Sequence, residues 1–286
     1  MMKKSFIKCP LNYIGGKTKI LDQILPFFPE NISTFVEPFC GGYNVGINIK
    51  AKKYFAFDIN AYLIELIDYL KQHDRDFILK SVDEVVSKYD LSLTNRDGYN
   101  KLRDDYNNVK NPLYLFVLTC YSFNHQIRYN NSFDFNTPFG KDRSCYNESI
   151  RFNLINFIDA LHNQDVKFEV SDYKKVSSLD LDGESFVYCD PPYFITTGSY
   201  NDGKRGFGDW KEKDEIELLS LLDQLNNKGI KFALSNVMVH NGLKNNILEK
   251  WSSKYNVHFI STNYNNSNYH SKAKEHETLE VLITNY

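Results

Sequence analysis

The sequence predicts an α/β fold, in which a mostly parallel sheet carries a helical insertion and ends in an antiparallel hairpin. Three observations support this fold. Short apolar runs of strand length alternate with helical patterns toward both ends of the chain. From about residue 71 to residue 160, apolar positions recur only at helical spacing, in the ranges 75–88, 95–106 and 111–122. Near the C-terminus, a long polar stretch without a helix separates two strand-like runs, and such strands pair antiparallel.

Composition places the chain among globular proteins. Of its 286 residues, 42% are hydrophobic and 24% are charged, and no run of eighteen apolar residues predicts a membrane helix. Five scattered cysteines without a C-x-x-C motif, and no signal-peptide pattern, favour a reduced, cytoplasmic setting. The seven histidines show no metal-ligand spacing, so no metal is expected. With a net charge of −2, any contact with nucleic acid requires positive charge that is concentrated locally.

Near the N-terminus, two glycines precede a lysine in the segment 12–18. A nucleotide-binding phosphate loop would also need a glycine at position 11, where this chain has Leu11, so we reject that motif. The glycines still allow close approach of the backbone, and Lys17 can meet an anion. The alternative is a simple turn that opens a helix at 17–25.

A glycine turn, residues 37–42, lies between the first expected strand and its helix. A strand, a glycine turn and a helix in this order place a ligand at the helix N-terminus. Asp58 follows sixteen positions after Gly42, at the tip of the second strand, where an acid can bind ribose hydroxyls. Asp58 alone could equally be a helix N-cap, but turn and acid together favour a nucleoside-containing cofactor. In this part of the chain we expect strands at 34–36 and 54–57 and helices at 44–50 and 61–70.

The second half of the sheet contains further polar residues at strand ends. Ser171-Asp172-Tyr173 follows the strand at 166–170 and places an acid and an aromatic ring together. Residues 195–213 contain four glycines with Lys204 and Arg205, which predicts a loop able to close over a site or grip phosphates. We expect the other strands at 185–189, 230–234, 257–260 and 278–284 and the other helices at 147–161, 212–226 and 241–250.

Asp190-Pro191-Pro192-Tyr193 follows the apolar run at 185–189, at the carboxyl end of a strand where open α/β sheets bind ligands. Proline cannot continue the strand ladder, so the chain leaves the sheet there. Asp190 can accept hydrogen bonds from an amine, and Tyr193 offers a flat face to a planar ring. This set suits the exocyclic amino group of an aromatic base. The alternative is an ordinary proline-rich turn.

The end of the insertion, residues 122–143, mixes amides, Arg, Lys and aromatic residues without periodicity. Asn and Arg are residue types that read base edges and phosphates, so this segment is a candidate for binding nucleic acid. An ordinary polar loop is the alternative.

Six motifs in register resemble those of the Dam-type, or alpha-class, N6-adenine DNA methyltransferases, and the closing strand 280–286 also looks like the family's last strand. The resemblance implies a Rossmann-like S-adenosylmethionine methyltransferase sheet with an antiparallel terminal hairpin and an inserted helical target-recognition domain. The implied boundaries are 1–70 and 163–286 for the catalytic domain and 71–162 for target recognition. The six motifs are residues 13–17, 35–42, 57–60, 128–130 with 135–140, 171–173 and 190–193.

The resemblance also implies a cofactor site and a catalytic site. Lys17 would balance the methionine carboxylate of S-adenosyl-L-methionine, Asp58 would hold the ribose, and Asp172 would bind the adenine amine. Asp190, Pro191, Pro192 and Tyr193 would be the catalytic residues. The implied cofactor contacts are Tyr13, Gly15, Gly16, Lys17, Glu37, Pro38, Phe39, Gly41, Asp58, Ile59, Asp172, Tyr173 and Asp190.

The implied activity is methyl transfer to N6 of a flipped-out adenine in double-stranded DNA. The enzyme would be the modification enzyme of a restriction-modification system, a monomer, with a cognate restriction endonuclease as a candidate partner. Asn124-His125-Gln126-Ile127 replaces the family's more usual Asn-Gly-Leu before Arg128, a departure that bears on target specificity. The implied DNA contacts are Asn124, Arg128, Asn130, Asn136, Pro138, Lys141 and Arg143.

Three other functions compete with this one. An RNA adenine N6-methyltransferase can carry the same catalytic tetrad, although the insertion with Arg128 and Pro138 favours duplex DNA. A catalytically silent DNA-binding module would not need the intact tetrad. A NAD-dependent oxidoreductase would share the early strand and turn layout and leave Asp190 to Tyr193 unexplained.

Overall fold

The computed structural model describes residues 6–13, 15–196, 210–261 and 278–286. Most of the glycine-rich loop expected at 195–213, including Lys204 and Arg205, lies outside the described residues, as does most of the polar stretch before the last strand. Among the described residues, no helix is both long enough and apolar enough to span a membrane.

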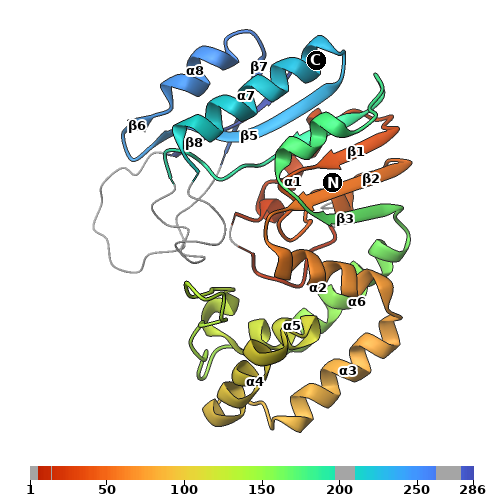
Figure 1. Ribbon diagram of the computed structural model, residues 1–286, viewed down its shortest axis with the longest axis vertical. Coiled ribbons are helices and arrows are strands. Elements are labelled where there is room, and N and C mark those ends of the chain that lie inside the picture. Colours follow the sequence, from red (N-terminus) through yellow and green to blue (C-terminus); the bar gives the residue numbers. More distant parts are fainter. Residues whose placement is uncertain (1–5, 14, 197–209, 262–277) are drawn as a thin grey trace.

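An eight-stranded sheet runs through the upper part of the molecule (Figure 1), in the order β3-β2-β1-β4-β5-β8-β7, with β6 paired to β5 outside this path. From β3 to β5 all neighbours are parallel, and β8 runs antiparallel to both β5 and β7. The mostly parallel sheet expected from the sequence is thereby confirmed. The strands are β1 (Thr34–Glu37), β2 (Lys53–Asp58), β3 (Val166–Val170), β4 (Phe186–Cys189), β5 (Lys231–His240), β6 (Leu243–Lys244), β7 (Asn256–Ile260) and β8 (Thr278–Thr284).

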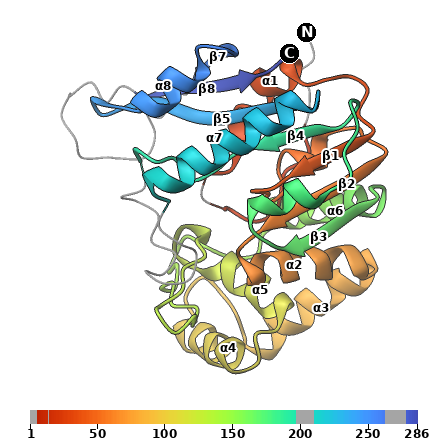
Figure 2. The same ribbon diagram turned by 45° about the horizontal axis from the view of Figure 1, so that its top comes forward.

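Helices cover both faces of the sheet (Figures 1 and 2). Six of them begin at an Asn or Asp side chain that accepts an N–H of the first turn, which satisfies donors that have no partner inside the helix. The α-helices are α1 (Leu21–Ile24), α2 (Ala61–Gln72), α3 (Arg75–Lys88), α4 (Arg96–Val109), α5 (Pro112–Tyr121), α6 (Glu148–His162), α7 (Glu212–Asn227) and α8 (Asn246–Ser252). The 3-10 turns are η1 (Lys17–Lys19), η2 (Leu25–Phe27), η3 (Gly46–Asn48), η4 (Phe123–His125) and η5 (Tyr173–Ser178).

The two faces of the sheet belong to two buried clusters, because successive side chains of a strand point to opposite sides. Phe186 and Tyr188 of β4 face α1, α2 and α6, whereas Val187 and Cys189 face α7, α8 and η5. The first cluster continues without a break into α3, α4 and α5, the helices at the lower end of Figure 1. Residues 71–162 therefore share one apolar core with the sheet.

Two expected helices differ from the structure near the glycine turn. The helix expected at 44–50 is only the single 3-10 turn η3, because Ile49 is already extended with φ −97° and ψ 148°. The Tyr54 hydroxyl donates to the Ile49 carbonyl at 2.9 Å and so satisfies a group that a longer helix would use. The helix expected at 17–25 is broken into η1, α1 and η2, and Pro26 lies at the start of η2.

The helix expected at 241–250 begins only at Asn246, because β5 extends to His240 and turns back into β6. The turn residues Asn241 and Gly242 have φ values of 50° and 81°. An Asn-Gly pair with both residues in the left-handed region is a strong signal for a two-residue hairpin. This signal was present in the sequence and was missed.

Candidate active site

A cavity of about 250 Å³ lies beside the carboxyl ends of β1, β2 and β4, where the sequence places its polar motifs. Every candidate cofactor-binding and catalytic residue lines this cavity, although these residues come from five separate segments of the chain. Asn44, Trp210 and Asp214, which the motifs did not single out, also line it, as do Ile127 and Tyr129 of the insertion. Parallel strands end at the same edge of the sheet, which explains why motifs far apart in sequence converge here.

The glycine turn is tied to the end of β2 by Asp58. The Gly41 N–H donates to Asp58 Oδ2 and the Asn60 N–H donates to Oδ1, each at 2.9 Å. Gly41 has a φ of +46°, a conformation that favours glycine, and an added Cβ would lie 3.1 Å from the Tyr13 ring. The alternative in which Asp58 caps the next helix is wrong, because Asn60 is the N-cap of α2.

Lys17 forms an ion pair with Asp190, the acid of the Asp-Pro-Pro-Tyr motif. Its Nζ is 2.7 Å from Asp190 Oδ2 and also donates to the Gly15 carbonyl at 3.0 Å. The same ammonium lies 5.0 Å from the centre of the Tyr193 ring. Since Lys17 is only 7% exposed, its charge acts in a poorly hydrated place.

Burial and neighbouring charges act against each other at Asp190. Burial raises the pKa of Asp190, the charge and hydrogen bond of Lys17 lower it, and the charge of Glu280 raises it, with a net upward shift. Burial also raises the pKa of Glu37 well above its usual range, although the Gly46 N–H donates to its Oε2 at 2.9 Å. Within the described part of the chain, the Lys17 ammonium and, to a smaller extent, the hydrogen bond from Tyr193 lower the Asp190 pKa and so favour its ionised form.

Tyr193 is buried, with its hydroxyl between two carboxylates. The hydroxyl oxygen lies 3.1 Å from Asp190 Oδ1 and 2.9 Å from Glu280 Oε1. Glu280 belongs to β8 and was missed as a site residue. A glutamate in the apolar run of a strand was the sequence signal that could have found it.

Aromatic residues form the other side of the cavity. Phe39 and Tyr173 stack with ring centres 5.4 Å apart, and Trp210 meets Phe39 edge-on at 5.6 Å. The Trp210 Nε1–H donates to Glu215 Oε2 at 2.8 Å, which fixes the indole beside the cavity. Ile59 is 46% exposed beside Asp58, so an apolar surface lies next to an acid.

The nucleic-acid candidate segment, whose residue types show no periodicity in the sequence, forms a hairpin in the structure. Bridges join Ser122 to Phe139 and Tyr129 to Phe135, and we call residues 121–140 the 121–140 hairpin. The Asn107 side chain of α4 accepts from the Phe135 N–H at 2.8 Å and donates to its carbonyl at 3.1 Å, as a neighbouring strand would.

The candidate DNA-contacting side chains lie in or directly after this hairpin. Arg128 is half-buried, and within the described residues its guanidinium makes no ion pair or hydrogen bond. The Asn130 side chain instead accepts from the Ser132 and Asp134 N–H groups and so stabilises the turn. The exposed candidates are Asn124, Asn130, Asn136, Pro138, Lys141 and Arg143.

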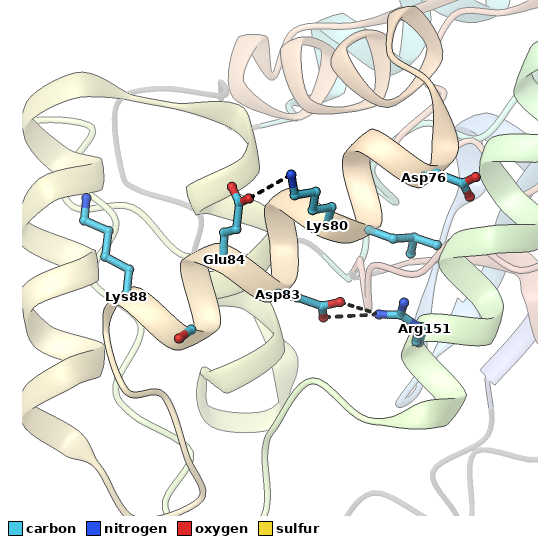
Figure 3. A pocket seen from close by; sticks show the side chains of 8 residues that line it. Asp76, Lys80, Asp83, Glu84, Lys88 and Arg151 are labelled. Atoms are coloured by element: carbon cyan, nitrogen blue, oxygen red, sulfur yellow. Dashed lines mark hydrogen bonds and ion pairs between the residues drawn. The ribbon is translucent and has the colours of Figure 1, made fainter.

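A second hollow lies between α3 and α6 (Figure 3). Its charged groups largely pair with each other: Arg151 binds Asp83 at 3.1 Å, and Lys80 binds Glu84 at 3.6 Å. None of the residues that the motifs singled out lines it. We therefore assign no function to this hollow.

Comparison with known proteins identifies the family. A family model described as D12 class N6 adenine-specific DNA methyltransferase matches residues 13–266. The chain is 49% identical over 282 residues to the type II methyltransferase M.FokI of Planomicrobium okeanokoites and 48% identical over 285 residues to the modification methylase StsI of Streptococcus sanguinis. Each alignment covers 99% of this chain and 43% of the relative. The type II methyltransferase M.MjaIII of Methanocaldococcus jannaschii is 32% identical over 255 residues, covering 80% of this chain and 84% of that protein.

A mostly parallel sheet whose carboxyl edge carries a glycine turn, an acidic strand end and Asp-Pro-Pro-Tyr is the architecture of a methyltransferase. The match over residues 13–266 specifies the kind: the chain belongs to the D12 class N6 adenine-specific DNA methyltransferase family. The resemblance drawn from the sequence motifs is thereby confirmed. The chain spans a little over two fifths of the length of M.FokI and StsI.

Proposed function

We propose that this chain transfers a methyl group from S-adenosyl-L-methionine to N6 of an adenine in double-stranded DNA. Residues 1–70 and 163–286 would form the catalytic domain, and residues 71–162 the target-recognition domain. The observation that carries the proposal is the position of Asp190, at the carboxyl end of β4 in the cavity that all the candidate cofactor residues line. M.FokI and StsI bear the names of modification enzymes, so we extend the proposal to a restriction-modification system with a cognate endonuclease.

The side chains of the cavity fit this cofactor in their chemistry. Asp58 lies at the end of β2 in the cavity and accepts the Gly41 and Asn60 N–H groups, and its carboxylate is an acceptor of the kind that binds ribose hydroxyls. Phe39 and the exposed Ile59 provide apolar surface for a purine, and Asp172 at the end of β3 can accept from its amine. The Lys17 ammonium has three N–H donors, of which Asp190 and the Gly15 carbonyl take two, so a third can meet the methionine carboxylate.

Methyl transfer to adenine is difficult because N6 is a poor nucleophile. The lone pair of adenine N6 is delocalised into the ring, and hydrogen bonds from both N6–H groups to fixed acceptors favour a more tetrahedral nitrogen. The Asp190 carboxylate and the Pro191 carbonyl would be these acceptors. The cofactor supplies a methyl group on a sulfonium sulfur, and positive charge grows on N6 as that group is transferred. A fixed carboxylate at this place stabilises the growing charge, and the proton can leave N6 afterwards.

The base must leave the duplex to reach Asp190, at a cost of a few kcal/mol. One face of the Tyr193 ring lies beside the Lys17 ammonium, so we propose that the base stacks on the other face. The 121–140 hairpin would hold the duplex, since Ile127 and Tyr129 reach the cavity wall while Arg128 and Asn136 lie in the same hairpin. The Asn12 side chain donates to the Asn124 carbonyl at 3.0 Å, which joins the hairpin to the cofactor motif.

The test is methyl transfer to DNA and RNA in parallel. Purified protein is incubated with labelled S-adenosylmethionine and with matched duplex DNA or RNA, and the methylated nucleoside is identified by mass spectrometry. We expect N6-methyladenine in duplex DNA, with the modified site read by sequencing. Methylation of RNA alone would favour the RNA methyltransferase, and no transfer in a single turnover would favour a silent binding module.

A further inference from the structure

Glu280 is a buried glutamate that none of the motif roles explains. It lies in β8, is 2% exposed, and has Val237 of β5 and Ile260 of β7 as its strand partners. Burying a carboxylate is expensive unless hydrogen bonds or opposite charges compensate for the lost hydration. A strand that only filled the core would carry an apolar residue here, so a buried carboxylate at this position indicates a role other than packing.

The direction of β8 brings Glu280 to the active edge of the sheet. Glu280 pairs with Val237, near the carboxyl end of β5, and β8 runs antiparallel to that strand. The early part of β8 therefore lies beside the carboxyl ends of the parallel strands, where Asp190 follows β4. As a result, two carboxylates from distant parts of the chain face the Tyr193 hydroxyl.

The number of available protons decides how these groups can interact. The Tyr193 hydroxyl has one proton and two carboxylate oxygens within hydrogen-bond distance, at 2.9 Å for Glu280 and 3.1 Å for Asp190. Donation to Glu280 leaves the lone pairs of Asp190 Oδ1 available. Donation to Asp190 would occupy Oδ1 in addition to Oδ2, which already accepts from Lys17 at 2.7 Å. An acceptor with both oxygens engaged binds an incoming amine less strongly.

We infer that Glu280 is a positioning residue for the methyl transfer proposed above: by accepting the Tyr193 proton, it leaves Asp190 Oδ1 available to the substrate amine. This inference rests on the proposed function. The same hydrogen bond fixes the Tyr193 hydroxyl and so holds the ring at one angle beside the base site. Glu280 acts through Tyr193, and also through Lys17, whose Nζ lies 3.9 Å from Glu280 Oε1.

The charge of Glu280 has a second and opposite effect, because it disfavours the ionised form of Asp190. Asp190 must be ionised to accept the amine protons, so the rate falls as the pH falls through the Asp190 pKa. Glu280 raises that pKa and Lys17 lowers it. Glu280→Gln should therefore move the acidic limb of the rate profile to lower pH, whereas Lys17→Met should move it to higher pH. Among the residues that the structure describes, the titratable and charged groups that interact electrostatically with Asp190 include Lys17, Glu37, Tyr188, Cys189, Tyr193 and Glu280.

The first experiment measures the single-turnover rate of methyl transfer at saturating DNA and cofactor, as a function of pH. Glu280→Gln keeps the shape, but its amide oxygen is a weaker acceptor than a carboxylate, so the Tyr193 proton should shift toward Asp190. We therefore expect the rate at neutral pH to fall about tenfold, the factor for one weakened hydrogen bond. Glu215→Gln is the matched control, because Glu215 is a second buried glutamate that accepts from Trp210, Asn236 and Asn245. We expect it to leave the acidic limb in place.

The second experiment is a double-mutant cycle with Tyr193→Phe, which removes the shared proton. If Glu280 acts through Tyr193, Glu280→Gln should slow the Tyr193→Phe protein by less than it slows the wild type. Equal slowing in both backgrounds, or an acidic limb that does not move in Glu280→Gln, would overturn the inference. A merely structural glutamate predicts lower stability with an unchanged pH profile.

A third measurement separates this inference from the proposed function. The ¹³C signal of the Asp190 carboxyl carbon can be titrated in the free protein without any substrate. We expect the Asp190 pKa to be lower in Glu280→Gln than in the wild type, and an unchanged value would sink the inference. A wild-type protein that methylates no DNA would instead contradict the proposed function, whatever the titration shows.

Discussion

The carboxyl edge of the sheet and the 121–140 hairpin hold their polar groups in different ways. At the sheet edge, Lys17, Asp190, Tyr193 and Glu280 are buried or nearly so and bind one another. In the hairpin, backbone groups are held by Asn107 of α4, while the candidate side chains mostly face solvent. One region therefore has its polar side chains fixed in advance, and the other has a fixed backbone with side chains still available.

This difference suits the two steps that we propose. Charge develops at one atom during methyl transfer, so the groups around that atom gain from being fixed and poorly hydrated. A DNA duplex presents phosphates and base edges over a wide surface. Side chains that face solvent can contact them without first breaking hydrogen bonds within the protein. Changes at the sheet edge should therefore affect every substrate, whereas changes in the hairpin should affect binding or choice of sequence.

The largest effect is expected for Asp190→Ala. Removing the acceptor should slow methyl transfer roughly a thousandfold on every DNA sequence, because within the described residues 190–196 no other carboxylate follows β4. Binding of S-adenosylmethionine, measured by calorimetry, should largely survive, since Asp58 and the aromatic residues remain. Methylation at a near-normal rate would remove Asp190 from the catalytic role.

Gly98→Ala tests whether the two regions fold as one unit. An added Cβ at Gly98 would lie 2.1 Å from the Tyr89 carbonyl oxygen, so we expect about 2–3 kcal/mol less stability in urea unfolding. One apolar cluster joins the sheet to α3, α4 and α5. The protein should therefore unfold in a single transition, and its midpoint should shift to a lower urea concentration in Gly98→Ala. Gly183→Ala is the control, since its Cβ meets nothing within 4 Å. Two transitions, of which only one shifts, would show that the insertion unfolds separately.

Asn107→Ala should loosen the hairpin without touching the chemistry. It removes two hydrogen bonds to the Phe135 backbone, and at about 1 kcal/mol each the dissociation constant for DNA should rise about thirtyfold. The single-turnover rate at saturating DNA should stay within a factor of two. Asn156→Ala on α6, whose side chain donates within its own helix, is the matched control. A lower rate with unchanged DNA affinity would contradict the division between the two regions.

Arg128→Ala should produce the smallest and most selective effect. A bidentate contact to one base is worth about 1–3 kcal/mol, so preference at a single base pair should fall about tenfold. The measurement compares methylation rates across a library of sites that differ by one base pair. Lys141→Ala is the comparison: a phosphate contact weakens all sequences equally and lowers the salt slope by about one. Equal loss on every sequence for Arg128→Ala would make it a phosphate contact instead.

Much of the fold was predictable because strand length and helical spacing are local properties. The sheet strands were all expected within a few residues, except that β5 is longer and turns back at Asn241-Gly242 into β6. The helix expected at 44–50 failed because tertiary hydrogen bonds of Tyr54 and Glu37 overrode a helix-like pattern. These local signals did not predict the order of the strands in the sheet, because that order depends on pairing between distant segments.

The sequence by itself determined the family and the residues that gather at the carboxyl edge, because each motif carries its own residue types in a fixed order. Only the tertiary structure decided how those residues are paired. Lys17 lies on Asp190, and Glu280 from the last strand shares Tyr193 with the same acid. Lys17 and Glu280, which are 263 residues apart, also approach to 3.9 Å, and the contacts of Glu280 depend on the antiparallel direction of β8, which brings its early residues to the active edge. Hydrogen bonds over such separations leave no periodic signal in the sequence, since they follow from the order and direction of the strands.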